Sequence, residues 1–293
     1  MRLGRNTKEI LIKNMFLGVA ALSILIILFI FIFLFKEAFP AFREMGLSLF
    51  TSDWSASQGK FGINAAVFGS VAVTGIAMLI AVPLGIGGAI FLSEISPPRL
   101  RVFLKPVIEL LAGIPSIVYG FIGVTVFVPY LAKTFDMLSG YSLLTGGIIL
   151  GIMALPTIVS ISDDALKAVP REIKEASLAL GASKWETIKL VTFPSAISGV
   201  TAGCIMGIGR AIGETMAVML VVGSVMRIPS PSFDVFETGS TITALIAGQM
   251  GEAWGMHTSV LFATAVILFL IVALLSVASD LLQARVEKKF RGG

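Results

Sequence analysis

The chain has 293 residues, of which 56% are hydrophobic and only 14% are charged, and its formal net charge is +4. Soluble domains carry about 25% charged residues, so most of this surface has too few charges to face water. The lone Cys204 excludes an internal disulfide, and the lone His257 excludes a multi-histidine zinc site. We therefore expect an integral membrane protein without a metal site.

Six apolar stretches are long enough to cross a hydrocarbon core of about 30 Å, which takes roughly 20 helical residues. The first has no charge, is too long for a signal-peptide core and lacks a small-residue cleavage site, so it is read as a retained anchor. The sequence predicts an all-α polytopic membrane protein with six transmembrane helices. The expected spans are 14–35, then stretches within 61–93, 110–132 and 137–162, then about 195–226, and a stretch within 253–279.

Lysine and arginine gather on one side of the predicted spans, and such an excess marks the cytoplasmic side. The other side receives only Lys36, Arg43, Lys60, Lys133 and Arg227. Both termini are therefore expected in the cytoplasm of a multi-pass protein of the plasma (inner) membrane. The sixteen residues of the basic side are Arg2, Arg5, Lys8, Lys13, Arg99, Arg101, Lys105, Lys167, Arg171, Lys174, Lys184, Lys189, Arg285, Lys288, Lys289 and Arg291.

The loop 163–194 falls on the basic side and is predicted to form two short helices, 170–180 and 184–193. Pro170 suits the start of a helix, and Gly181 suits the position just after a helix end. Ser183 and Glu186 have the spacing of a capping box, in which each side chain accepts the other's backbone N–H. An amphipathic hairpin lying on the headgroups is the competing interpretation. The acidic residues of the loop favour docking to a protein instead.

The same loop carries a motif known from one transporter family. Glu175-Ala176-Ser177, with Gly181 four residues later and Pro194 at the fifth span, resembles the "EAA" loop of ABC-transporter permeases. The usual pattern reads Glu-Ala-Ala and ends in Leu-Pro, where this chain has Ser177 and Phe-Pro. In that family the loop supplies a coupling helix that sits in a cleft of a cytoplasmic ATPase. The resemblance therefore implies that Glu175, Ala176, Ser177 and Gly181 couple to such an ATPase.

No Gly-x-x-x-x-Gly-Lys-Ser/Thr phosphate-binding loop occurs in the sequence. This chain is therefore expected to have no catalytic residues and no cofactor of its own. ATP and magnesium would be bound by a separate subunit.

Two charges lie inside the fifth span, where a charged residue is costly and is a functional candidate by default. Arg210 and Glu214 are four residues apart, so on a continuous helix they stack on one face and can pair. They would either form a structural ion pair or line a path on which Arg210 contacts an anion. Small residues that allow close helix packing share this face: Gly199, Gly203, Gly207, Gly213 and Ala217.

Two further segments, 209–216 and 110–120, resemble the phosphate-uptake permeases among the ABC transporters, and within them the PstC type more than the PstA type. The resemblance implies the type I importer (MetI-like) fold. Residues 1–60 would form the cytoplasmic start, first helix and outer loop, and 61–293 a five-helix core. Pro115 is expected to kink or break the third span. Ser116 and Thr215 join Arg210 and Glu214 as candidate residues of the substrate path.

The implied partners are an ABC ATPase subunit (PstB-like), a second permease (PstA-like) or a homologous copy, an extracytoplasmic phosphate-binding protein (PstS-like) and the lipid bilayer. No nucleic acid is expected. The competing functions are a permease for another oxyanion such as molybdate or sulfate, an ion-coupled secondary transporter using Glu214, and a non-transporting adaptor. The sequence leaves open whether the apolar stretch 242–247 packs on the outer mouth or re-enters it.

Overall fold

The computed structural model describes residues 5–231 and 234–291, so Arg2 of the basic side lies outside it. The described part is helical except for one short antiparallel hairpin, β1 (Trp54–Ser55) and β2 (Lys60–Phe61). Six helical segments there are long and apolar enough to cross a membrane, which confirms the predicted number of spans. They are Glu9–Phe50, Asn64–Ile95, Ser116–Thr134, Leu143–Lys167, Lys184–Gly213 and Met256–Leu281.

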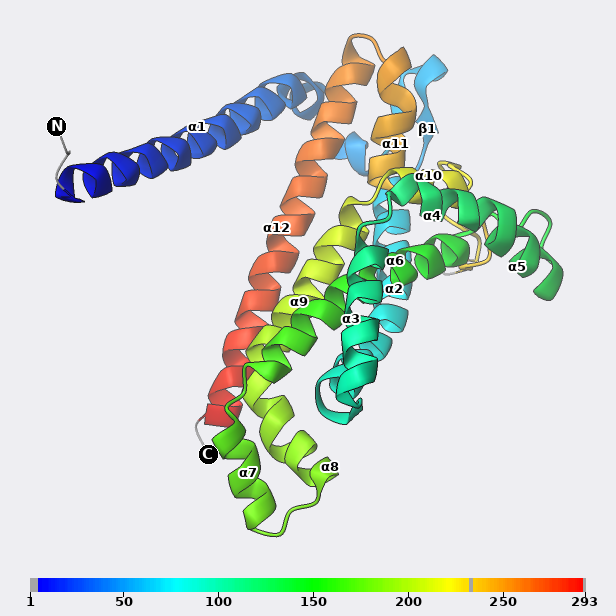
Figure 1. The fold of residues 1–293 in the computed structure, drawn as a ribbon. Helices are drawn as coiled ribbons and strands as arrows, with labels where there is room; N and C mark the ends of the chain where they lie inside the picture. The colour runs from blue at the N-terminus through cyan, green and yellow to red at the C-terminus, as the bar shows by residue number, and fades with distance from the viewer. Residues whose placement is uncertain (1–4, 232–233, 292–293) are drawn as a thin grey trace.

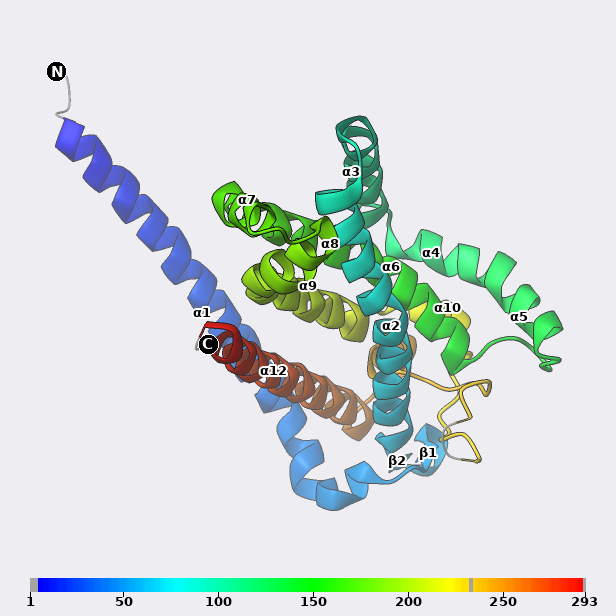
Figure 2. The same cartoon turned by 90° about the horizontal axis from the view of Figure 1, so that it is seen from below.

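Three helices form the centre of the molecule: α2 (Asn64–Ile90), α6 (Leu143–Lys167) and α9 (Phe193–Gly213). Figures 1 and 2 show them side by side, with α12 (Met256–Arg291) against α9. Glycines allow this close approach. A Cβ on Gly147 would lie 2.4 Å from Ile76 of α2, and one on Gly207 would lie 2.7 Å from Ile158 of α6. Packing of small residues drives helix association where lipid leaves little hydrophobic force between helices.

Helix α1 (Arg5–Met45) is longer than the predicted span 14–35 and projects away from the bundle (Figure 1). Its C-terminal part packs on α12, where the Phe31 and Phe269 rings meet edge to face with centroids 4.4 Å apart. The C-terminal end of α12 lies at the end of the molecule that carries α7, whereas the N-terminal end of α1 lies far from it (Figure 1). The side of the membrane that holds the N-terminus therefore stays a prediction.

The stretch predicted as the third span, within 110–132, is interrupted at 113–115, which confirms the break expected at Pro115; the observed span begins directly after it, at Ser116. Upstream of this break, α2 ends in the π-helical turn η3 (Phe91–Ile95). The next helix, α3 (Pro98–Ala112), leads to the break. After it come α4 (Ser116–Ile122), the π-helical turn η4 (Gly123–Phe127) and α5 (Val128–Thr134). Figure 2 shows α4 and α5 projecting away from the central helices.

The fifth span is also interrupted, and the expected continuous helix over 195–226 is wrong. Helix α9 ends at Gly213, Glu214 has an extended backbone (φ −70°, ψ 133°), and a separate short helix α10 (Met216–Val221) follows. Helix α10 packs against α4, where a Cβ on Gly120 would lie 3.1 Å from the Cα of Ala217. The two broken spans therefore meet through the segments that follow their breaks.

The loop 163–194 has the predicted local signals but not the predicted second helix. Helix α7 (Arg171–Ala179) ends at Gly181 with φ +89°, and Ser183 and Glu186 form the capping box that starts α8 (Lys184–Thr187). Helix α8 then runs without a break through a π-helical turn, η5 (Ile188–Thr192), into α9. The expected helix end at Phe193 is wrong, because the helix continues from the π-helical turn η5 past Pro194 into α9.

The opposite end of the molecule holds the 3-10 helices η1 (Gly46–Phe50), η2 (Ala56–Gln58) and η6 (Met250–Glu252), together with α11 (Ile242–Gln249). Helix α11 packs on α2, α10 and α12 and buries Ile242 and Leu245. Its first backbone N–H, at Ile242, donates to Ser70 Oγ of α2 at 2.9 Å. The apolar stretch that the sequence left open is thus a helix packed on the bundle.

We expect Gly69→Ala to destabilise the protein, because a Cβ at residue 69 of α2 would lie 1.9 Å from the carbonyl oxygen of Ser240. Overpacking of this kind typically costs about 1–3 kcal/mol. Gly75→Ala in the same helix is the matched control, since its Cβ would have no heavy atom within 4 Å. The measurement is the apparent melting temperature in detergent. Equal melting temperatures for the two variants would contradict the close approach of α2 to Ser240.

Candidate substrate pathway and docking loop

Arg210 lies at the meeting point of three helices. From α9, its Nη2 donates to the carbonyl oxygen of Ala112 at 3.3 Å, and its Nη1 donates to Thr157 Oγ1 of α6 at 3.4 Å. Ala112 is the last residue of α3, so its carbonyl lacks an acceptor role within its own helix and lies at the negative end of the helix dipole. Both contacts are long for hydrogen bonds, so they hold the guanidinium only weakly.

Of the two alternatives for Arg210 and Glu214, the structure does not show the ion pair among the residues it describes. In the part of the chain that the structure describes, no carboxylate oxygen lies within 4.0 Å of the Arg210 guanidinium. The helix ends at Gly213, so Glu214 does not stack on the face that carries Arg210. A charge inside a span is costly unless it is compensated. Arg210 is therefore a partly buried cation held by two neutral oxygens.

Glu214 instead stabilises the start of α10. Its Oε1 accepts the backbone N–H of Thr215 at 3.1 Å and that of Ala217 at 3.3 Å. The first N–H groups of a helix have no partner within the helix, and a nearby carboxylate satisfies them and complements the helix dipole. The backbone oxygen of Glu214 in turn accepts the Thr243 hydroxyl of α11 at 2.7 Å. Glu214 thus joins the break in the fifth span to α11.

The other two predicted path residues are also placed at the breaks. Ser116 begins α4 and is partly exposed, and Thr215 directly precedes α10, with its hydroxyl 3.5 Å from the carbonyl oxygen of Gly213. Tyr119 of α4 bridges the first break, because its hydroxyl donates to the carbonyl oxygen of Leu111 at 2.9 Å. Arg210 thus lies at the end of α3, close in the chain to Ser116, while Glu214 and Thr215 lie directly before α10.

Sequence reasoning missed Thr157 and the Ala112 carbonyl as partners of Arg210. Thr157 follows Pro156 within an apolar span, so a polar residue beside a helix proline was the available signal.

The position of Ala112 depends on α3, which Lys105 ties to α6. Lys105 Nζ lies 2.6 Å from Asp164 Oδ1 and 3.6 Å from Asp163 Oδ2. Its hydrogen bond to Asp164 raises the pKa of Lys105.

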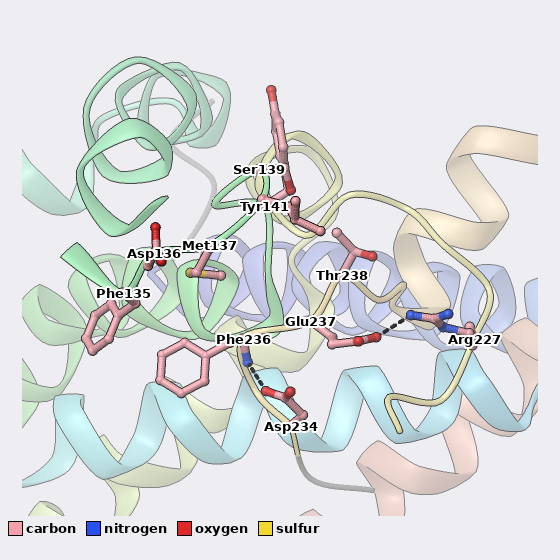
Figure 3. A pocket seen from close by; sticks show the side chains of 11 residues that line it. Phe135, Asp136, Met137, Ser139, Tyr141, Arg227, Asp234, Phe236, Glu237 and Thr238 are labelled. Atoms are coloured by element: carbon pink, nitrogen blue, oxygen red, sulfur yellow. Dashed lines mark hydrogen bonds and ion pairs between the residues drawn. The ribbon is translucent and has the colours of Figure 1, made fainter. Parts of the chain in front are cut away.

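A cavity of about 450 Å³ lies between two loops that the sequence assigns to the outer side (Figure 3). One loop connects α5 to α6, and the other follows α10. Arg227 forms an ion pair with Glu237, and Asp234 Oδ1 accepts the backbone N–H of Phe236 at 3.0 Å. Phe135 packs against Phe236 with ring centroids 5.0 Å apart. The two loops therefore form one concave surface at the end of the molecule opposite α7.

The loop 163–194, which we call the docking loop, presents apolar side chains at the other end of the molecule. Leu180 is 90% exposed and Trp185 is 60% exposed, and Ile173 and Leu178 are also exposed. Glu175 and Ala176 lie on the exposed part of α7. Ser177 points inward, where its hydroxyl lies 3.1 Å from Thr187 Oγ1 and joins α7 to the helix that starts at Ser183. Exposed apolar side chains at a water-facing loop mark an interaction surface.

The family model described as "binding-protein-dependent transport system inner membrane component" matches residues 81–292. The chain therefore belongs to this family of inner-membrane permeases of ABC importers. It is a multi-pass permease subunit whose ATPase is a separate subunit, which confirms the predicted class and argues against an ion-coupled secondary transporter.

Within the family, the chain is similar to proteins named PstC. It is 39% identical over 291 residues to the phosphate transport system permease protein PstC of Mesorhizobium japonicum, with 92% of this chain and 88% of that protein covered. It is also 38% identical to the probable PstC of Methanocaldococcus jannaschii, with 81% of each chain covered. A match to the probable ABC transporter permease YqgH of Bacillus subtilis has 47% identity and spans 67% of this chain and 62% of that protein. The predicted PstC-type resemblance is confirmed.

Solved structures show the same fold at low sequence identity. The bacterial alginate ABC transporter gives a TM-score of 0.67 at 16% identity, with 98% of this chain and 99% of that chain covered. The MetNI methionine ABC transporter gives a TM-score of 0.61 at 19% identity, with 76% and 95% covered. The predicted MetI-like fold is confirmed.

We expect Glu214→Ala to destabilise the protein by about 1 kcal/mol, the usual cost of losing a side-chain cap at a helix start. Glu214→Gln keeps a carbonyl acceptor for Thr215 and Ala217, so it should lose less than half as much. Both are read as apparent melting temperatures in detergent. Equal losses in the two variants would show that the negative charge of Glu214 matters more than its acceptor atom.

Proposed function

We propose that this chain is a permease subunit of an ATP-driven importer that carries inorganic phosphate. The observation that carries the proposal is Arg210, a cation within a span that has no carboxylate partner among the described residues. An arginine has a permanent charge and several donors, which suits a tetrahedral oxyanion. The names of its PstC relatives support phosphate as that oxyanion.

In this proposal an anion would replace the weak neutral contacts of Arg210. The Ala112 carbonyl and the Thr157 hydroxyl lie at 3.3 Å and 3.4 Å from the guanidinium, and neither carries a charge. A charge-assisted bond to phosphate is roughly twice as strong as a neutral hydrogen bond. Ser116 and Thr215 would add hydroxyl groups at the two breaks, and Glu214 would hold α10 in place.

The outer end would receive phosphate from an extracytoplasmic, PstS-like binding protein, and the family description names dependence on such a protein. The concave surface between the loops at Phe135 and Arg227 is our candidate for its docking. The docking loop and both termini would lie in the cytoplasm, as the sixteen-to-five distribution of basic residues indicates. Residues 1–60 would form the peripheral segment, and 61–293 the transport core with a coupling loop at 163–194.

A PstB-like ATPase would bind the exposed face of α7, and a PstA-like permease or a homologous copy would complete the pore. ATP and magnesium would be held by the ATPase. Movement of the docking loop would reach Arg210 directly, because the helical segment Lys184–Gly213 is continuous and carries Arg210 near its far end. This continuity supports alternating access driven from the ATPase side.

We expect Arg210→Gln to lower phosphate uptake at least tenfold in proteoliposomes that contain the whole transporter, since a hydrogen bond to a charged group contributes about 1.5–3 kcal/mol. Arg43→Gln, which removes an exposed cation of α1, is the matched control and should leave uptake unchanged. Sulfate and molybdate are added as competitors of radiolabelled phosphate. Normal uptake by an assembled Arg210→Gln complex would show that Arg210 does not act in the substrate path. If molybdate or sulfate competed more strongly than unlabelled phosphate, that oxyanion would be the substrate instead.

We expect Leu180→Asp to reduce co-purification of the ATPase subunit at least tenfold, because the central apolar residues of an interface often contribute 2 kcal/mol or more. Leu180 is 90% exposed at the end of α7. Leu47→Asp is the control, because Leu47 is 87% exposed but lies in η1 at the opposite end of the molecule. Retention of the ATPase by the Leu180→Asp variant would exclude this surface as its docking site.

A further inference from the structure

Lys174 of α7 points toward the transmembrane core. Its Nζ lies 2.7 Å from Glu94 Oε1, in the turn η3 that continues α2, and it also donates to the carbonyl oxygen of Leu166 at 3.2 Å. The Lys174 side chain is only 19% exposed and that of Glu94 only 13%. The neighbouring Ile173 and Glu175 are exposed on the docking side. Lys174 therefore faces away from the surface proposed for the ATPase.

Glu94 belongs to a junction of several helices. Ser93 Oγ donates to the same carboxylate oxygen at 3.0 Å. Arg101 of α3 donates from Nε to the carbonyl oxygen of Leu92 at 2.7 Å and from Nη2 to that of Ser93. The last carbonyl groups of a helix need such partners, and a cation there complements the helix dipole. Lys174 thus ties α7 to a point where α2, α3 and the end of α6 are already joined.

We propose that Lys174 is a positioning residue that transmits the movement of α7 to α2, and this inference rests on the proposed docking of an ATPase at α7. The chain itself joins α7 to α6 on one side and to the α8–α9 helix on the other. Glu94 lies 80 residues from Lys174 in the chain, so the ion pair supplies a link that the backbone does not. With it, a displacement of α7 moves all three central helices together.

The partial burial of the pair makes the link stronger than a fully exposed pair would be. Exposed ion pairs contribute little, whereas the loss of one partner of a buried pair leaves an uncompensated charge and is strongly destabilising. Separation of α7 from η3 would therefore be unfavourable at each step of the transport cycle. Without Lys174, α7 would still move together with the ATPase, but the movement of α2 would no longer be coupled to that of α7.

The test compares three quantities in the reconstituted complex: ATPase co-purification, ATP hydrolysis, and inorganic phosphate taken up per ATP hydrolysed. For Lys174→Met we expect normal co-purification, hydrolysis within about twofold, and a fall of about tenfold in phosphate per ATP, the effect of roughly 1.4 kcal/mol of lost coupling. Lys174→Arg keeps the charge and should restore the ratio. Arg43→Met removes an exposed cation of α1, outside the docking loop, and is the control.

Glu94→Gln gives an independent readout if the Lys174→Met variant does not accumulate. It retains an acceptor for Lys174 but removes the charge, so we expect phosphate per ATP to fall by about threefold. An unchanged ratio in a Lys174→Met or Glu94→Gln complex that binds its ATPase overturns the inference and leaves the proposed function intact. Loss of ATPase binding in these variants also overturns it, because Lys174 would then act in docking. Failure of the unmodified chain to bind an ATPase would overturn the proposed function itself.

Discussion

The structure depends on one constraint, which is that backbone polar groups inside a membrane need partners within the protein. Two of the predicted spans break, at 113–115 and at Glu214, and each break releases N–H and carbonyl groups that a continuous helix would have paired. At the first break, Arg210 and Tyr119 donate to the carbonyl groups of Ala112 and Leu111. At the second, Glu214 accepts two N–H groups of α10, and Thr243 donates to its backbone oxygen. The polar residues of the candidate path are thus the residues that make the breaks possible.

This double role explains why the candidate site lies where broken helices meet. A transport path needs polar atoms at membrane depth, and irregular backbone is tolerated there only where it is enclosed by protein or lines a cavity. Arg210 serves both needs, because it satisfies a helix end and still carries a charge without a carboxylate partner among the described residues. A hydrophobic residue at this position would leave the end of α3 without that donor.

Local signals allowed much of the fold to be predicted from the sequence. The six spans follow from apolar length, the break at Pro115 from a missing N–H, the end of α7 from Gly181, and the start of α8 from the Ser183 capping box. The break at Glu214 could not be predicted in this way, because no proline marks it and its partner Thr243 lies 29 residues further on. The contact of Arg210 with Ala112 joins residues 98 positions apart. Such tertiary contacts override the helical spacing that suggested an Arg210–Glu214 pair.

The unbroken helix that starts after Ser183 has a mechanical consequence. Its 30 residues, Lys184–Gly213, extend for about 45 Å at 1.5 Å per residue. Tilting a rod of that length by 5° about one end displaces the other end by roughly 4 Å, which exceeds the length of the contacts that Arg210 makes with Ala112 and Thr157. A small rotation at the docking loop is therefore amplified into a change of partners for the guanidinium.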